Sequence, residues 1–587
     1  MSRRWLSLLL VLGLLMGALT GCGDKTTSGQ TSTNFGVETA TLSPSPEILP
    51  DSTVDSAPTT GSFAMPINES YGWDPYACLS MENRAVMQLI YEGLFVLNNE
   101  FDPEPWLCKS YTVSEDGLVY TLELQDAAFS NGKALNADDV VYSMEQASLS
   151  ELYGDRFYDI SSYYASGLTT VTIELSEPND RLPCLLNFPI IPAAVSTVSP
   201  VGTGPFVRNG NSVLTINTQW WQGADTLNFQ TVTLYSSASA EDTRDGFEID
   251  NVHFVYNDPS SSTAATFHCD YELWNSRGTV MQYIGFNFSN GIFQDQEVRA
   301  AITHAIDRSG IAESVYHNFA DAAALPVASS SSMYDEDLAL EFSYTSVKEV
   351  IAELMETSSF YLPEDYVPSS GPLSDSLVSA EPSQAPEEEA EASEDPSADE
   401  DENADTETAN DGEEDADGEE ETDGDKTDSD DTTAYNAITM LVMEGNLNRE
   451  AAARQVAQNL TDVGFTVTLN SYEEEEFVYR LNTGEWDIYY GEVVLQPDFD
   501  LRPLLSSGGS LNYGGFSGSS ELSSLMAKAQ ENSGNRYDLY EYIMEQGYLC
   551  PVLFINNAVF TTRGVFTGLN PSPDFLFYQI SNIHVNN

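Results

Sequence analysis

The sequence predicts an α/β protein with room for more than one lobe, because 587 residues exceed what a single compact core needs. Residues 119–124 alternate polar and apolar side chains in the period-2 pattern of a half-buried strand. The Asn131-Gly132 pair then marks a tight turn, and Asn136 is placed to cap a helix with Asp138 and Asp139 in its first turn. The apolar stripe predicted for that helix is Val140, Val141, Met144 and Ala147.

The charge of the chain is strongly negative and unevenly spread. A net charge of −71, from 93 acidic and 22 basic residues, argues against nucleic acid as a partner because phosphates would be repelled. Residues 381–431 alone hold 26 Asp and Glu and one Lys, about a third of that net charge. Residues 362–433, with almost no aromatic residues, are therefore predicted to be a disordered acidic insertion; a domain boundary is the alternative.

The N-terminus has the pattern of an export signal. Arg3 and Arg4 precede an apolar run, 6–19, that is shorter than the roughly 20 residues a membrane span needs. The run ends in Leu19-Thr20-Gly21-Cys22, which looks like a lipobox. We therefore predict a signal peptide over 1–21, lipidation of Cys22 and an anchor on the outer face of the cytoplasmic membrane. An ordinary signal peptide that happens to precede a cysteine is the alternative.

Residues 22–60 are rich in Ser, Thr and Pro without periodic apolar residues, which predicts a flexible stalk. Five further cysteines follow, and their odd number leaves at least one unpaired within a monomer. Their spacing fits no zinc pattern, so buried thiols or one or two disulfides both remain open. They are Cys78, Cys108, Cys184, Cys269 and Cys550.

The sequence nominates no catalytic set, no metal site and no cofactor. The five histidines are scattered, and none lies in an HExxH or similar frame. His268-Cys269-Asp270 is the one local cluster of metal-capable groups, and we interpret it as a coincidence in a loop. Gly202–Phe206 is rich in glycine, but no Gly-Lys-Ser/Thr follows it, so we expect a tight turn entering a strand.

Several spaced segments resemble the bacterial extracellular solute-binding proteins of family 5, the dipeptide, oligopeptide and nickel binders of ABC importers. The first are Tyr91-Glu92-Gly93-Leu94, residues 114–121 (SEDGLVYT), Phe129-Ser130-Asn131-Gly132 and residues 137–143 (ADDVVYS). Later ones are Trp73-Asp74-Pro75, Gly202–Phe206, Trp220-Trp221, residues 283–287 (YIGFN), 293–308, 484–488 (GEWDI), 512–516 (NYGGF) and 551–554.

The resemblance implies a two-lobed α/β fold of the periplasmic-binding-protein type, in its large type II, peptide-binder class. The chain is expected to cross between the lobes near residues 283–287 and 551–557, with the ligand enclosed at the interface and held by hinge closure. The expected domains are lobe I (61–75, 201–285 and 551–587), its accessory subdomain (76–200), and lobe II (286–550, interrupted by 362–433).

The resemblance also gives candidate ligand-binding residues. Peptide-binding members use an aspartate and two tryptophans; here Val493 and Glu474 stand at the tryptophan positions and Gln496 near the aspartate. Asp498 and Asp500 lie close enough to replace that aspartate after a small shift of register. The remaining candidates are Leu79, Met81, Tyr283 and Glu492.

If Glu474 and Glu492 face the cleft, they favour a cationic or amine-bearing ligand, since a buried carboxylate needs a partner. Solvated surface charges are the alternative. The expected function is the membrane-anchored, extracytoplasmic binding component of an ABC importer, with permease and ATPase subunits as partners and a peptide or related small solute as ligand. A surface sensor or adhesion lipoprotein that keeps the fold without transport is the alternative.

Overall fold

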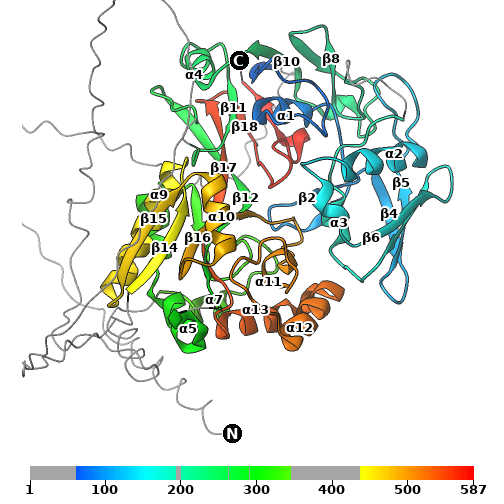
Figure 1. Cartoon of the computed structure of the whole chain (residues 1–587). Helices are drawn as coiled ribbons and strands as arrows, with labels where there is room; N and C mark the ends of the chain where they lie inside the picture. Colours follow the sequence, from blue (N-terminus) through cyan, green and yellow to red (C-terminus); the bar gives the residue numbers. More distant parts are fainter. Residues whose placement is uncertain (1–60, 194–199, 262–263, 290, 345–436, 587) are drawn as a thin grey trace, which may run out of the picture. The chain divides into compact units, whose positions relative to one another are not determined.

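The computed structural model describes residues 61–193, 200–261, 264–289, 291–344 and 437–586 (Figure 1). The signal peptide, Cys22, the stalk and the acidic insertion lie outside these described residues. The described chain is a mixed α/β structure with several sheets, and its two longest strands lie side by side in the largest of them.

The first sheet has four strands in the order β1-β10-β9-β8. Strand β1 (Gly61–Ile67) runs parallel to β10 (Phe229–Ser236). Strands β9 (Val213–Ile216) and β8 (Phe206–Asn209) continue it in antiparallel fashion. The predicted turn before β8 is confirmed. A Cβ at Gly202 would collide with the backbone of Ile90, so only glycine allows this close approach.

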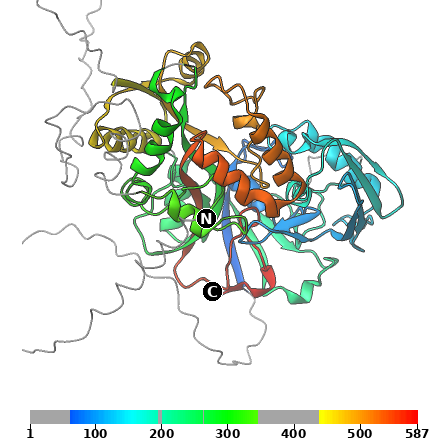
Figure 2. The same cartoon turned by 90° about the horizontal axis from the view of Figure 1, so that it is seen from below.

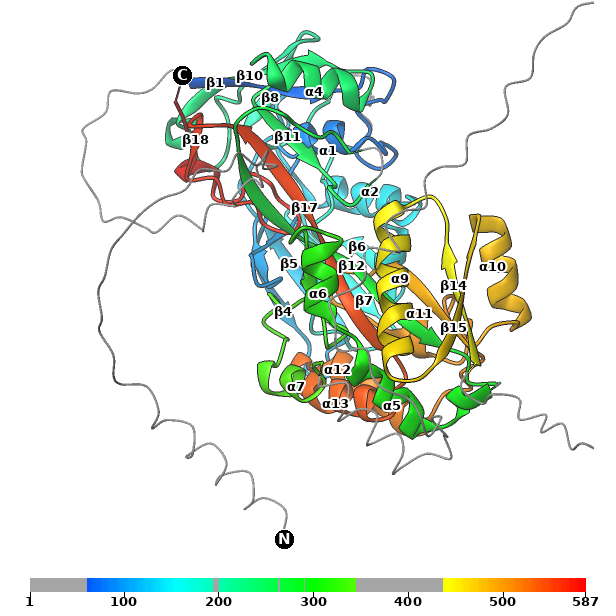
Figure 3. The ribbon, with the colours of Figure 1, turned by 90° about the vertical axis from the view of Figure 1, so that its left-hand side faces the viewer.

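The largest sheet has seven strands and contains the two longest of the described chain. In it β12 and β17 pair antiparallel along most of their lengths, and Figure 3 shows β17, in red, running from beside β11 towards α5. The strand order is β11 (Phe254–Asn257), β17 (Cys550–Thr562), β12 (Tyr271–Phe286), β16 (Ile488–Val494), β14 (Ala437–Met443) and β15 (Thr466–Tyr472), with β13 (Ala320–Ala322) paired to β17.

Strand β12 changes neighbours within its length. Residues 271–276 lie in the part of the sheet that β11 extends, whereas residues 280–286 pair with β16. The register shifts between Ser276 and Val280, a few residues before the predicted crossing at 283–287. We call the part built on the first sheet lobe I and the part built on β14, β15 and β16 lobe II. Their limits along the chain stay a prediction.

A separate four-stranded antiparallel sheet forms the accessory part of lobe I. Its order is β4 (Cys108–Val113), β5 (Val119–Leu124), β7 (Thr170–Leu175) and β6 (Ile160–Ala165). The strand predicted over 119–124 is confirmed, with Tyr120, Leu122 and Leu124 buried. Strands β2 (Phe95–Leu97) and β3 (Pro103–Pro105) form a short hairpin before it.

Helix α2 (Ala137–Ser148) packs on this accessory sheet and begins as predicted. The Asn136 side chain accepts from the backbone N–H of Asp139, whose carboxylate accepts in return from the N–H of Asn136, a complete capping box. One residue of the predicted stripe is wrong. Val141 is only half-buried, and Ser143 is buried instead because its hydroxyl bonds to the backbone of Ile191.

The remaining helices cover the sheets and link them. Helix α9 packs on β14 and β15. None of the helices in the described part of the chain is long and apolar enough to cross a membrane. The α-helices are α1 (Met81–Met87), α3 (Leu182–Leu185), α4 (Ala240–Glu248), α5 (Gln296–Ala305), α6 (Arg308–Ser314), α7 (Glu336–Glu341), α9 (Leu447–Asp462), α10 (Glu474–Thr483), α11 (Arg502–Leu505), α12 (Ser520–Glu531) and α13 (Arg536–Glu545).

Short elements complete the description. Strands β18 (Phe566–Thr567) and β19 (His584–Val585) pair with each other. The 3₁₀ helices are η3 (Gly154–Phe157), η4 (Ala224–Thr226), η5 (Gly291–Gln294), η7 (Ser533–Asn535) and η8 (Ile580–Asn582).

The apolar core of lobe II includes side chains from the accessory part of lobe I. Leu97, Phe101 and Cys184 belong to the same buried cluster as Phe499, and the rings of Phe101 and Phe499 lie 5.2 Å apart edge to face. Figure 2 shows the orange helices of residues 520–545 beside the accessory sheet in blue and cyan. The two lobes are therefore in contact through packed side chains as well as through β12 and β17.

The five cysteines of the described chain are all free thiols. Of the two alternatives left open by the sequence, unpaired thiols are therefore the outcome. Four of them are buried, and burial raises the pKa of Cys108 to about 12, so this thiol stays protonated.

Candidate functional site

Tyr283, a predicted site residue, is buried on β12 where this strand pairs with β16. Its hydroxyl lies 3.1 Å from that of Tyr489, and burial raises the pKa of both phenols. The two tyrosines line a hollow of about 20 Å³ together with Tyr513. Because that volume is close to that of a single water molecule, the hollow is too small for a solute.

Glu492 and Val493 lie on β16, directly opposite Gln282 and Met281 of β12. The carboxylate of Glu492 accepts from the side-chain amide of Gln282 at 2.7 Å and pairs with Arg449 at 3.3 Å. Its charge is thus already balanced within lobe II. Val493 is half-buried against the apolar core of the same lobe.

Four other predicted ligand-binding residues do not form one site. Leu79 is exposed in the loop before α1, and Met81, half-buried, is the first residue of that helix. Glu474 is exposed in the first turn of α10, on lobe II. Gln496 is half-buried in the loop after β16, where its carbonyl oxygen accepts from the N–H of Phe499.

Asp498 lies where the two lobes touch, and it is 2% exposed. Its carboxylate accepts from the side-chain amides of Asn179 in lobe I and Gln530 in lobe II, each at 3.2 Å. Asp180 continues this contact, because its carboxylate accepts from the backbone N–H and hydroxyl of Ser533. Asp498, one of the predicted ligand-binding residues, therefore links the two lobes through hydrogen bonds to protein side chains.

A bidentate ion pair also links the two lobes. The guanidinium of Arg502, at the start of α11, donates to both carboxylate oxygens of Asp159 in the accessory part, at 2.9 and 2.6 Å. It also donates to Asp500. Burial and the neighbouring charge of Asp498 raise the pKa of Asp500 to about 6.

Sequence reasoning missed a group of polar side chains on lobe I, which we call the arginine cluster: Arg84, Tyr153, Arg156, Asn187, Tyr256 and Asp574. Helix α1 carries Arg84, η3 carries Arg156, and Tyr256 lies on β11. All six are half-buried. Asp574 comes from the segment between β18 and η8, which α1 holds through Gln88.

Contacts within the arginine cluster fix its geometry. The guanidinium of Arg156 lies 4.9 Å above the ring of Tyr153 and donates to the side-chain oxygen of Asn187. The amide of Asn187 donates in turn to Asp574 at 2.6 Å. Arg84 and Arg156 both act electrostatically on Tyr153.

Burial shifts the pKa values of two charged groups in the arginine cluster, Arg156 and Asp574. Burial lowers the pKa of Arg156 and raises the pKa of Asp574 to about 6, although Asn187, the N–H of Leu97 and Ser572 all donate to that carboxylate. Asp498 of lobe II also acts on Arg156. The cluster therefore lies within electrostatic reach of the contact between the lobes.

A signal for the cluster was present in the sequence. With only 22 basic residues in 587, each arginine is notable, and Arg84 lies on α1 directly before the apolar residues 85–87. The other members of the cluster are far from Arg84 in the chain, however, so no local pattern connects it to Arg156, Tyr256 and Asp574.

Glu92, within a quoted family segment, is buried in lobe I beneath three tryptophans. The indole N–H groups of Trp106 and Trp220 donate to one of its carboxylate oxygens and that of Trp221 to the other, each at 3.0 Å. Burial raises the pKa of this carboxyl. Because the three indole N–H groups satisfy the carboxylate, Glu92 holds the three tryptophans in position.

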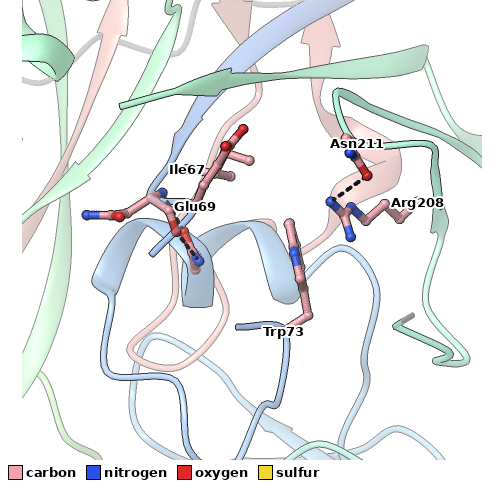
Figure 4. Close-up of a pocket in the computed structure, with 7 residues that line it drawn as sticks. Ile67, Glu69, Trp73, Arg208 and Asn211 are labelled. Carbon is pink, nitrogen blue, oxygen red and sulfur yellow. Dashed lines mark hydrogen bonds between the residues drawn. The ribbon is translucent and has the colours of Figure 1, made fainter. Parts of the chain in front are cut away.

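A second hollow, of about 190 Å³, lies beside the carboxyl end of β1 (Figure 4). The guanidinium of Arg208 lies 4.4 Å over the ring of Trp73 and donates to Asn211, while Glu69 faces it from the loop after β1. This volume is smaller than the roughly 300 Å³ at which small-molecule pockets begin. The hollow belongs to lobe I alone.

The residues of the predicted loop cluster at 268–270 have other neighbours. A ring nitrogen of His268 lies 3.1 Å from Glu248, and Asp270 pairs with Arg563 at 3.4 Å. Both are surface contacts.

Comparisons with known proteins place this arrangement in context. The glutathione-binding protein GsiB of Escherichia coli K12 is 27% identical over 271 residues, which is 42% of this chain and 52% of that protein. The chain thus spans about half the length of the curated relatives it matches.

Solved structures match over a longer stretch. The oligopeptide-binding protein AppA of Bacillus subtilis, in complex with a nonapeptide, is 20% identical with a TM-score of 0.54. It is covered completely by 90% of this chain. The periplasmic murein tripeptide-binding protein MppA, in its unliganded open form, is 16% identical with a TM-score of 0.65, over 90% of this chain and 98% of that one. These likenesses confirm the predicted two-lobed α/β fold.

The family model of the middle region of these proteins matches residues 102–512, well over half of the chain. That range includes the accessory sheet, β12 and β16, whereas β17 follows it in the chain. The chain belongs to the bacterial extracellular solute-binding proteins of family 5.

Proposed function

We propose that this protein is the solute-binding component of an ABC importer, which captures a peptide or related small solute between its lobes and delivers it to a permease and its ATPase. One observation carries the proposal: the arginine cluster holds half-buried charged groups, among them the Arg84 guanidinium with no hydrogen bond or ion pair in the described part of the chain, within electrostatic reach of lobe II. A solute would supply the missing partners. The relatives point to the same class, since a glutathione binder, an oligopeptide binder and a murein tripeptide binder all take peptides.

The proposed capture uses a hinge in the two long strands. The register of β12 shifts between Ser276 and Val280, beside Ile555–Asn557 of β17, and such irregular positions absorb backbone rotation with little loss of pairing. Closure is then held by the contacts of Asp498 and Arg502 across the lobes. The proposal assigns no catalytic residue and no cofactor.

The proposed location is the outer face of the cytoplasmic membrane, through a lipid on Cys22. The support is the sequence of residues 1–22, with its two arginines, short apolar run and lipobox-like end. A lipid tether would keep the binding protein close to its permease.

A thermal-shift screen tests the function. Native-state binding stabilises by mass action, by about 2.7 kcal/mol at a ligand concentration one hundred times the Kd. The protein is first unfolded and refolded to remove bound solute, then screened against libraries of peptides and amines. At least one compound is expected to raise the melting temperature by several degrees in proportion to the logarithm of its concentration.

Uptake by a deletion strain separates transport from binding alone. Loss of uptake of the compound found in the screen supports the importer. Binding without any change in uptake contradicts transport and favours the surface-sensor alternative. A screen without a single binding compound contradicts both.

A further inference from the structure

The hollow beside the carboxyl end of β1, which we call the β1 hollow, is lined by lobe I alone. Its walls come from the loop after β1, from helix α1 and from the β8–β9 hairpin (Figure 4). Its volume of about 190 Å³ compares with the roughly 30 Å³ that one molecule of liquid water occupies. The β1 hollow is therefore too small for a peptide, but it has room for a single small solute.

The loop that carries Glu69 into the β1 hollow is held from both sides by a buried side chain. Asn83 of α1 is 1% exposed, and its side-chain oxygen accepts from the backbone N–H of Asn68 at 2.8 Å. The amide of Asn83 donates to the carbonyl oxygens of Asn68 and Tyr71, at 3.0 and 3.4 Å. A ligand that meets Glu69 therefore has no loop to order, which removes one entropic cost of binding.

Trp73 and Arg208 form another wall of the β1 hollow. The guanidinium of Arg208 lies 4.4 Å over the indole ring, and the hydroxyl of Tyr91 holds the backbone carbonyl of Trp73 at 3.1 Å. The one hydrogen bond of this guanidinium among the described residues reaches Asn211 at 3.4 Å, longer than a usual N–H···O bond. Its Nε is buried without a partner there. The stacked guanidinium is thus held in position with donors left to fill.

The charges of the β1 hollow are opposite but do not meet. Glu69 is the acid whose charge acts on Arg208, and burial lowers the pKa of that guanidinium. In the part of the chain that the structure describes, however, the two side chains form no ion pair, and the Glu69 carboxylate accepts no hydrogen bond. A simple anion would be repelled by Glu69 and a simple cation by Arg208. A molecule that carries both charges satisfies both side chains at once.

We propose that the β1 hollow is a second binding site, separate from the contact between the lobes, and that its ligand is a free amino acid. The ammonium group of the amino acid donates to Glu69, and its carboxylate accepts from Nε and an Nη of Arg208, the edge that suits a carboxylate. The indole of Trp73 and the buried Ile67 provide apolar surface for a small side chain. This inference goes beyond the proposed function, because a site of this size cannot hold the transported peptide.

Blocked derivatives test the proposal on the unmodified protein. A thermal-shift screen of the refolded protein against the common free L-amino acids selects the best binder, which isothermal titration then compares with its N-acetyl form and its amide. Each blocked form is expected to bind at least tenfold more weakly, because it leaves one protein charge without its partner. A screen in which no amino acid binds overturns the proposal. A blocked form that binds as tightly as the free amino acid also overturns it, and neither result bears on the importer function.

Two variants assign the ends of the ligand. Glu69→Gln should weaken binding of the free amino acid at least tenfold and bring it within twofold of the N-acetyl form, and Arg208→Gln should do the same relative to the amide. Glu151→Gln and Arg563→Gln, at exposed positions of the described chain, are the matched controls and should each stay within twofold of the unmodified protein. Binding that survives both hollow variants overturns the proposal. Since the blocked derivatives need only the unmodified protein, misfolding of a variant does not spare it.

Discussion

Asp574 is a carboxylate whose protonation is coupled to folding. Burial raises its pKa to about 6, above the value of roughly 3.9 for an unfolded chain. The folded protein therefore binds the proton more tightly than the unfolded one, so this group favours folding below pH 4. That contribution is lost as the pH rises from about 4 to about 6. The shift of about two units sets an upper limit of about 3 kcal/mol on the effect.

Asp574→Asn is accordingly expected to flatten the pH dependence of stability. Between pH 4 and pH 7 the unmodified protein should lose stability relative to the variant, as measured by urea unfolding at several pH values. Asp225→Asn, an exposed aspartate on η4, serves as the control and should follow the unmodified curve. A variant curve that also follows the unmodified one would mean that Asp574 is fully solvated.

The proposed membrane anchor depends on Cys22. Replacing it with Ala should block lipidation and release the protein from membranes, because the apolar run over 6–19 is too short to span a bilayer. Membrane fractionation in high salt followed by immunoblotting measures the change. Continued association of the variant with membranes would contradict the lipid anchor.

At the scale of elements, the contact of α11 with the accessory part is a bidentate ion pair between the lobes. Arg502 and Asp159 have side chains that are 17% and 7% exposed. Replacing Arg502 with Met leaves Asp159 and Asp500 close together without their cation. Breaking a buried pair in this way costs about 3 kcal/mol or more.

The Arg502→Met variant is therefore expected to open the protein and lower its stability. Small-angle scattering should record a larger radius of gyration, and denaturant unfolding a lower midpoint. Arg244→Met, an exposed arginine with acidic neighbours on its own helix, should change neither quantity. Equal radii for the two variants would show that other contacts hold the lobes.

The acidic segment 381–431 is an element of sequence that lies outside the described residues. Its composition predicts no contribution to a core, and loop closure costs only about 0.6 kcal/mol per doubling of length. A short Gly-Ser linker in its place should keep the melting temperature within a few degrees and the solute affinity unchanged. A large loss of either would mean that the acidic segment packs on a lobe or shapes the site.

At the scale of the whole molecule, local patterns predicted elements well. The strand at 119–124 and the helix capped by Asn136 need only neighbouring residues to be recognised, and both are present. Val141 was misplaced because a tertiary contact, the hydroxyl of Ser143 on Ile191, decides which helix face is buried. The sequence pattern could not include that contact.

The site was harder to predict, because its residues come together only in the fold. Positions carried over from the family brought Asp498 to the contact between the lobes, where Asn179 and Gln530 already satisfy it. Asp574 comes hundreds of residues after Arg84 and Arg156 in the chain, so no rule of sequence spacing connects the three residues. Only the fold brings Arg156 over the ring of Tyr153 and connects it through Asn187 to Asp574.

Native mass spectrometry of the protein purified from its own host tests the central claim, binding of a small solute between the lobes, most directly. We expect a population heavier than the chain by the mass of one solute, lost on mild unfolding. The released molecule should raise the melting temperature of the refolded protein. A solute-free spectrum, together with no host extract that raises the melting temperature, would contradict solute binding.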